Sequence, residues 1–160
     1  MFRDMRRSKQ QLTEAENIEI LKQGTYGVLS VAGEDGYPYG VPVNYVYEDG
    51  KIYIHGANAG HKIDAIRRNS KVTFCVVDKS DVIKEEYTTR YRSVIAFGKA
   101  KIVADEREIL AIAEKLAIRF WPEDTKEHRD RVIANDIKVL GIIEIELEHV
   151  TGKQQKALVK

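Results

Sequence analysis

The chain of 160 residues has little cysteine: Cys75 is its single thiol. One thiol cannot form an internal disulfide, a CxxC redox pair, a four-thiolate zinc site or an iron–sulfur cluster. Cys75 lies in the apolar run KVTFCVV, which favours a buried small hydrophobe over a nucleophile. Redox chemistry in this chain would therefore need a bound organic cofactor.

Several motifs of cofactor and metal chemistry are also missing. No GxGxxG follows a strand-like run and no GxxxxGK[ST] is present, which excludes the usual Rossmann and P-loop signatures. No GxSxG elbow occurs either. The histidines, which have no ligand-like spacing, are His55, His61, His128 and His149. The sequence therefore predicts no metal site.

Neither sign of charge dominates, and long hydrophobic runs are absent. Lys and Arg number 26 against 25 Asp and Glu, for a formal net charge of +1, so neither nucleic acid nor a membrane is predicted as a partner. No apolar run approaches the roughly 18 residues of a transmembrane helix. The start MFRDMRRSK lacks the apolar stretch of a signal peptide, so we expect a cytoplasmic protein.

Local signals that begin and end helices and turns are clear. Thr13 and Glu16 form a capping-box pattern before a helix that ends at Gly24. Asp49-Gly50 predicts a tight hairpin, and residues 33–36 predict another turn. These signals fix where several elements start and stop.

The remaining pattern is typical of a mainly β domain with flanking helices (α+β). We expect six strands, at residues 27–32, 39–48, 51–55, 71–78, 90–103 and 139–149. After the first helix, further helices are expected at residues 60–69, 105–121 and 123–136. The charged, poorly patterned residues 81–89 predict a loop or a frayed helix. Strands at this spacing, linked by hairpins, favour an antiparallel barrel over a doubly wound sheet.

The length predicts a single domain covering residues 1–160. Within it, we expect an N-terminal arm and helix at 1–24, the barrel core at 25–103, a helical pair at 104–136, and the final strand and tail at 137–160. No composition shift marks a linker between these parts.

The segment leading to Lys62 carries the strongest indication of chemistry. A strand ends in the small-residue loop GANAG, and a helix opens at His61. Free N–H groups at a helix N-terminus bind anions, and glycines let a phosphate approach the backbone. The cations His61 and Lys62 oppose the helix dipole there, which indicates a phosphate facing Lys62. On this motif alone, a solvated lysine on an ordinary turn is an equally good interpretation.

His55 closes the strand before that loop. Histidine titrates near neutral pH, so His55 could orient a ligand or supply a proton, although a hydrogen bond within the sheet is the simpler interpretation.

Several tyrosines lie in the same region of the sequence. Contacts in the core or at a dimer interface are a better interpretation of these rings than contacts with a cofactor. The tyrosines are Tyr37, Tyr39, Tyr45, Tyr47 and Tyr53.

Five segments together resemble one family. They are FRDMRRSKQ (2–10), GYPYGVPVNYVY (36–47), IYIHGA (52–57), GHKID (60–64) and SVIAFGKA (93–100). In this order they resemble the Nim-type, 5-nitroimidazole-resistance branch of the pyridoxamine 5′-phosphate oxidase-like flavoproteins. The resemblance implies a six-stranded antiparallel split β-barrel of the FMN-binding type. It also implies a homodimer, with FMN in two symmetric clefts at the interface.

The resemblance implies individual site residues as well. Residues 42–45 match the strand whose backbone faces the flavin ring, and His61 and Lys62 match the basic pair that holds the FMN phosphate. Ser93 and Trp121 would reach the cofactor from the partner subunit. The full set of implied cofactor contacts is Pro42, Val43, Asn44, Tyr45, His55, Gly56, Ala57, His61, Lys62, Ser93 and Trp121.

The implied activity is that of a flavin-dependent reductase. FMN would take a hydride from NADH or NADPH and reduce a small electron-poor substrate such as a nitroaromatic, with His55 as the catalytic residue that positions substrate or donates a proton. His61 stands where the oxidases proper have arginine, which predicts weaker, more pH-sensitive phosphate binding. No motif for the phosphate of pyridoxamine phosphate is recognisable near the C-terminus.

Two alternatives stay open at this point. One is a module that binds FMN, haem or a deazaflavin without turnover, in which His149 would be the axial ligand of a haem. The other is a purely structural dimer with a vacant cleft.

Overall fold

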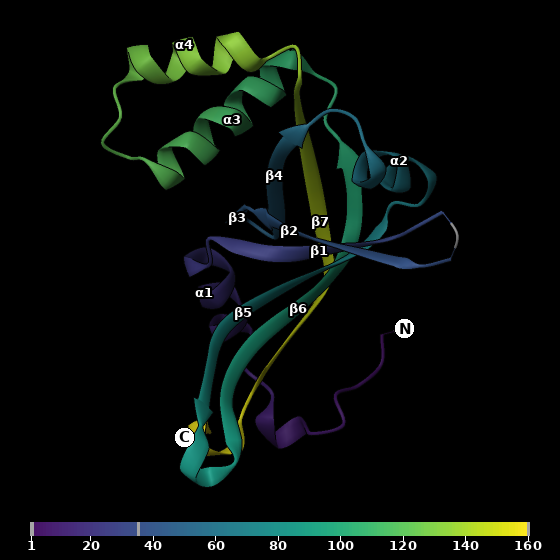
Figure 1. The fold of residues 1–160 in the computed structure, drawn as a ribbon, viewed down its shortest axis with the longest axis vertical. Coiled ribbons are helices and arrows are strands. Elements are labelled where there is room, and N and C mark those ends of the chain that lie inside the picture. The colour runs from purple at the N-terminus through teal and green to yellow at the C-terminus, as the bar shows by residue number, and fades with distance from the viewer. Residues whose placement is uncertain (1, 35, 160) are drawn as a thin grey trace.

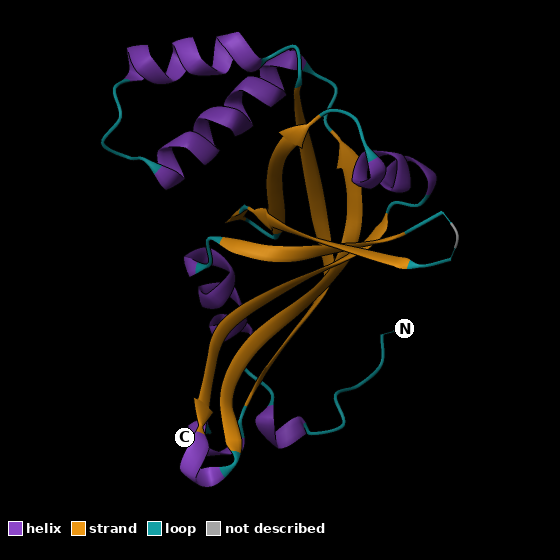
Figure 2. Ribbon diagram, viewed as in Figure 1, coloured by secondary structure: helices purple, strands orange, loops and turns teal. Residues whose placement is uncertain are grey.

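The protein is built on one curved antiparallel sheet, in a computed structural model that describes residues 2–34 and 36–159 (Figures 1 and 2). The strands are β1 (Tyr26–Ala32), β2 (Pro38–Asn44), β3 (Val46–Glu48), β4 (Lys51–Ala57), β5 (Lys71–Ile83), β6 (Thr88–Ile102) and β7 (Leu140–Gln154). The helices are α1 (Glu14–Gln23), α2 (His61–Arg68), α3 (Glu106–Phe120) and α4 (Lys126–Asp136), with short 3-10 helices η1 (Ser8–Gln10), η2 (Lys84–Glu86) and η3 (Lys156–Leu158). The predicted turn at 33–36 includes residue 35, which lies outside the described residues, as do the two ends of the predicted domain 1–160.

The seven strands pair in the order β2-β1-β5-β6-β7-β4-β3. The antiparallel, mainly β prediction is confirmed, but the described residues form seven strands rather than six, and the sheet is not closed, so the six-stranded split barrel is not confirmed. The seventh strand arises because the expected strand 39–48 is divided at Tyr45 into β2 and β3. The Tyr45 side chain is fully buried, where its hydroxyl donates to the Leu21 carbonyl oxygen (2.8 Å) and its ring packs edge-on against Phe74. This contact breaks the strand and holds the end of α1 against the sheet.

The capping box and the tight hairpin are confirmed. The Glu16 carboxylate accepts from the Thr13 N–H (2.8 Å), and the Thr13 hydroxyl oxygen accepts from the Glu16 N–H (3.3 Å). Between β3 and β4, Asp49 and Gly50 have φ of 47° and 79°. Positive φ at both residues is typical of the two-residue hairpin turn, whose backbone twist matches that of the strands it connects.

The prediction of a loop or a frayed helix at residues 81–89 holds only for the short helix η2 at the centre of the segment, because strands occupy both of its ends. β5 continues to Ile83 and pairs with β6, which starts at Thr88, so the region is the tip of a long hairpin. Together with the end of β7, these strands extend from the body as an arm, with the C-terminal end of the chain beside its tip (Figure 1). Because the arm is solvated on both sides, its sequence has no hydrophobic alternation to indicate a strand.

Two clusters of buried side chains lie on opposite faces of β4. Ile52 and Ile54 are fully buried in the main core, whereas Tyr53 packs in a smaller cluster with Ile112 and Leu116 of α3. Successive side chains of a strand point to opposite faces, so β4 separates the two clusters. Helix α3 therefore covers one face of the sheet beside β4.

Cys75 lies outside both clusters, contrary to the prediction that it is a core residue. It is half-buried on the outer face of the sheet, opposite Val28 of β1 and Ile95 of β6. Burial raises the pKa of its thiol, which disfavours the nucleophilic thiolate.

Among the described residues, no helix is long and apolar enough to cross a membrane.

Glu144 of β7 is a buried carboxylate. Lys51 donates to its carboxylate from β4 (2.9 Å), and Lys101 lies 3.2 Å away on β6. Burial alone would raise the pKa of Glu144, but the hydrogen bonds from the two lysines outweigh it and hold the pKa below its usual value. The three charges tie β4, β7 and β6 together beneath α3.

We expect Tyr45→Phe to destabilise the fold by about 1 kcal/mol, because the Leu21 carbonyl loses a buried hydrogen bond. Urea denaturation measures this change. Tyr87→Phe is the control, because Tyr87 is 98% exposed. Equal effects of the two substitutions would contradict the structural role of the Tyr45 hydroxyl.

The Glu144 network predicts a specific pH dependence. A carboxylate with a lowered folded pKa stabilises the fold above its unfolded pKa, and this contribution is lost as pH falls through the folded pKa. The free energy of unfolding should fall more steeply between about pH 6 and about pH 3 in the wild type than in Glu144→Gln. Glu146→Gln, at an exposed position of the same strand, should follow the wild-type curve. Parallel curves for the wild type and Glu144→Gln would disprove the network's contribution.

Candidate functional site

The predicted anion site lies at the corner where β4 leads into α2. Gly60 precedes the helix with φ of 110°, a conformation that side chains rarely allow. It provides no side-chain cap, and although its carbonyl oxygen accepts from the Ile63 N–H (2.9 Å), the N–H groups of His61 and Lys62 have no capping side chain there. The start of α2 therefore presents a partial positive charge to any bound anion.

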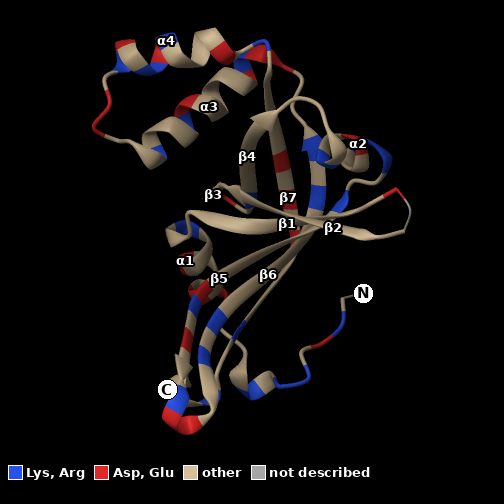
Figure 3. Cartoon of the chain, in the orientation of Figure 1, with Lys and Arg blue, Asp and Glu red and all other residues tan. Residues whose placement is uncertain are grey.

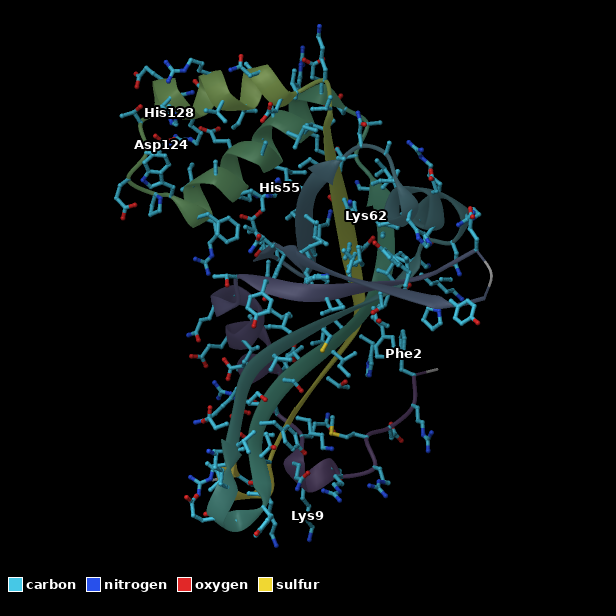
Figure 4. The ribbon with its side chains drawn as sticks, viewed as in Figure 1. Phe2, Lys9, His55, Lys62, Asp124 and His128 are labelled. Atoms are coloured by element: carbon cyan, nitrogen blue, oxygen red, sulfur yellow. The ribbon has the colours of Figure 1, made fainter. Side chains whose placement is uncertain are left out.

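Lys62 brings a full positive charge to this corner, beside the start of α2 (Figure 4). Its Nζ would lie only 3.5 Å from a Cβ built on Gly56, so the lysine lies over the bare backbone of β4. Lys62 is half-buried and forms no ion pair within residues 2–34 and 36–159. Because a cation in the first helical turn opposes the dipole, an anion held between them would stabilise both.

The ring of His61 is held against β2. It stacks on Tyr39 with ring centroids 4.2 Å apart and planes 16° apart. An ion pair between Glu34 and Arg68 fastens the β1–β2 hairpin to the other end of α2, and the hydrogen bond from Arg68 lowers the pKa of Glu34. Tyr39 is a site residue that the sequence did not single out, because its contact with His61 joins elements far apart in the chain.

The residues expected to face the flavin ring lie at an edge of the sheet. Among the described residues, β2 pairs with β1 alone, which leaves the other side of its backbone open. Pro42 is exposed and Val43 half-buried, while the Asn44 amide donates to the Thr25 carbonyl oxygen (2.9 Å). Tyr45 lies beyond the strand with its side chain in the core, so it could contribute only backbone atoms.

His55 and Lys62 are on opposite faces of β4. Since Gly56 faces Lys62, the neighbouring side chains of His55 and Ala57 point the other way. His55 borders a mostly apolar pocket of about 280 Å³ between β4, α3 and α4 (Figure 4). The structure therefore does not bring this histidine to the phosphate corner.

Ser93 and Trp121 are not part of the corner either. Ser93 lies on the outer face of β6, between Val77 and Lys153 of the adjacent strands. Trp121 follows α3, where Arg119 donates to a carbonyl oxygen at the end of α1 (3.2 Å). The contact of these residues with a cofactor from a second subunit, which the family resemblance implies, stays a prediction.

The other histidines have local partners. His149 of β7 stacks on Phe2 with ring centroids 4.6 Å apart, so Phe2 covers one face of its ring. His128 of α4 contacts the Asp124 carboxylate through Nδ1 (2.9 Å) and packs against Trp121 (Figure 4). Neither histidine lies at the corner.

Comparison with solved structures finds the same fold in a candidate antibiotic resistance protein, a flavocytochrome and an FAD-binding protein. A candidate 5-nitroimidazole antibiotic resistance protein from Bacteroides thetaiotaomicron superposes with a TM-score of 0.75 at 21% identity, over 90% of this chain and 86% of its own. A flavocytochrome from Azotobacter vinelandii gives 0.77 at 17% identity, over 96% of this chain and 72% of its own. An FAD-binding protein from Mesorhizobium loti gives 0.67 at 22% identity, over 92% of this chain and 98% of its own.

No curated protein matches the chain. The family profile described as pyridoxamine 5′-phosphate oxidase matches residues 13–154, which include every strand and α-helix of the fold. The match covers β4, α2 and the corner between them. The chain therefore belongs to the pyridoxamine 5′-phosphate oxidase-like family.

Proposed function

We propose that this protein is an FMN-dependent oxidoreductase that acts as a homodimer on a small electron-poor substrate. The observation that carries the proposal is the corner of β4 and α2, where Lys62 lies over Gly56 beside a helix start without a side-chain cap and has no ion-pair partner within residues 2–34 and 36–159. These groups fit a phosphate monoester: one cation, free N–H donors and a glycine backbone that leaves room. Flavin binding by proteins of the same fold supports the choice of cofactor.

Each part of the corner would have a distinct role. Lys62, the His61 ring held by Tyr39, and the first-turn N–H groups of α2 would bind the phosphate. The open backbone edge of β2 at residues 42–44 would orient the ring. Bound FMN would supply electron transfer from NADH or NADPH to a nitroaromatic-like substrate.

We assign His55 to the substrate rather than to the phosphate. Its side chain faces the apolar pocket beside α3, on the other side of β4 from Lys62. Leu116 and Leu140 line that pocket, which suits a small apolar ring, and His55 would donate a hydrogen bond to a polar group on it.

The outer face of the sheet supports the proposed dimer. Pro42, Val28, Cys75, Ile95 and Thr151 form one row across five strands, without a charged side chain. Val28 and Ile95 are 38% and 43% exposed. A second copy would cover this row, and Ser93 of the adjoining row would then belong to the interface.

Lys62→Ala should weaken FMN binding at least about tenfold, because it removes a charged hydrogen-bond donor to the phosphate. Gly56→Val should act in the same direction by filling the space under Lys62. Quenching of FMN fluorescence on titration measures both. The control is Lys138→Ala, at an exposed lysine beyond α4. Unchanged affinity in Lys62→Ala would remove this lysine from the site.

Ile95→Asp should convert the dimer into a monomer of about 18.3 kDa and abolish FMN binding, because it places a charge at the proposed interface. Sedimentation equilibrium gives the mass. Leu110→Asp on α3, also exposed, should leave the dimer intact. A wild-type protein that sediments as a monomer and still binds FMN would refute the interface site.

A further inference from the structure

A second positively charged hollow lies on the arm. The tip of the arm is at the opposite end of the molecule from α3 and α4 (Figure 1). The hollow is a groove of about 780 Å³ built from three separate segments: the N-terminal arm, the β5–β6 hairpin and the C-terminal residues beside η3. Each segment contributes one cation, namely Arg7, Lys84 and Lys156. Three distant parts of the chain therefore bring like charges to one groove.

None of these three cations has a carboxylate partner within residues 2–34 and 36–159. Three other cations of the arm are paired: Arg90 with Glu86 (3.0 Å), Arg92 with Asp78 (2.5 Å) and Lys79 with Asp81 (3.2 Å). Like charges that line one hollow repel one another, and a bound anion would turn that repulsion into attraction. The groove thus has charge that the fold itself does not neutralise.

The same groove offers an apolar, aromatic surface beside its cations. Tyr87 is 98% exposed and Val82 is 69% exposed, although both are large apolar side chains. The opposite wall is fixed, because the Tyr91 hydroxyl contacts Gln10 (3.4 Å) and Lys153 lies over the Tyr91 ring. A flat ring could stack on Tyr87 while an attached anion meets the cations.

We propose that this groove binds a phosphorylated small molecule with a flat ring, of the nucleotide class. Arg7, Lys84 and Lys156 would contact the phosphate groups, and Tyr87 the ring. An anionic membrane fits less well, because Glu85 and Glu86 place negative charge at the outermost tip of the hairpin (Figure 3). The proposal does not rest on flavin binding, since it uses no residue of the β4–α2 corner.

Calorimetric titration with ADP, pyrophosphate and adenosine tests the proposal on the full chain. The variant Arg7→Gln/Lys84→Gln/Lys156→Gln should weaken ADP binding at least about tenfold. Its matched control is Arg131→Gln/Lys138→Gln/Lys22→Gln, which removes the same charge from exposed positions elsewhere and should bind ADP as the wild type does. Tyr87→Ala should weaken ADP at least about fivefold while leaving pyrophosphate unchanged.

The outcomes separate the possible ligands and sites. Salt should weaken ADP binding, because the Debye length falls from about 10 Å at 0.1 M to about 3 Å at 1 M. ADP binding that is lost in Lys62→Ala but kept in the groove variant would overturn the proposal by assigning ADP to the β4–α2 corner. Equal losses in the groove variant and its control, or groove-dependent binding to phosphatidylserine vesicles without binding to ADP, would also overturn it.

Discussion

The alternation of side chains along β4 decides how the functional parts of this protein are divided. Ile52, Ile54 and Gly56 point to the main core and α2, whereas Tyr53 and His55 point to α3. Because the period of a strand is two, neighbouring residues cannot face the same side. One strand therefore separates a cationic, glycine-lined corner from an apolar pocket bordered by a histidine. The proposed roles of phosphate anchor and substrate contact follow from this division.

The corner itself combines several small effects on one anion. Gly60 adopts a backbone conformation that few other residues accept, and Gly56 leaves space for Lys62 above the strand. The helix dipole and the lysine repel each other until an anion lies between them. The stacked Tyr39 and His61 rings hold the β2 edge next to this point, so a bound molecule could contact helix, strand end and sheet edge together.

Local chemistry made part of this arrangement predictable. The capping box at Thr13, the hairpin at Asp49-Gly50 and the glycine-rich entry to α2 each depend on neighbouring residues, and each is present. The features that the sequence did not reveal depend on distant partners. Tyr45 divides a strand because its hydroxyl meets Leu21, and Tyr39 meets His61 only after the sheet has folded. The arm formed around residues 81–89 lacks hydrophobic alternation because no core covers it.

A crystal structure of the protein grown with FMN would test the central claim most directly. The account predicts a dimer whose flavin phosphate accepts hydrogen bonds from the Lys62 ammonium and the first-turn N–H groups of α2. It also predicts the ring against the open edge of β2, with Ser93 supplied by the second subunit. A flavin phosphate held by other residues, with the corner of Gly56, His61 and Lys62 left to solvent, would contradict it.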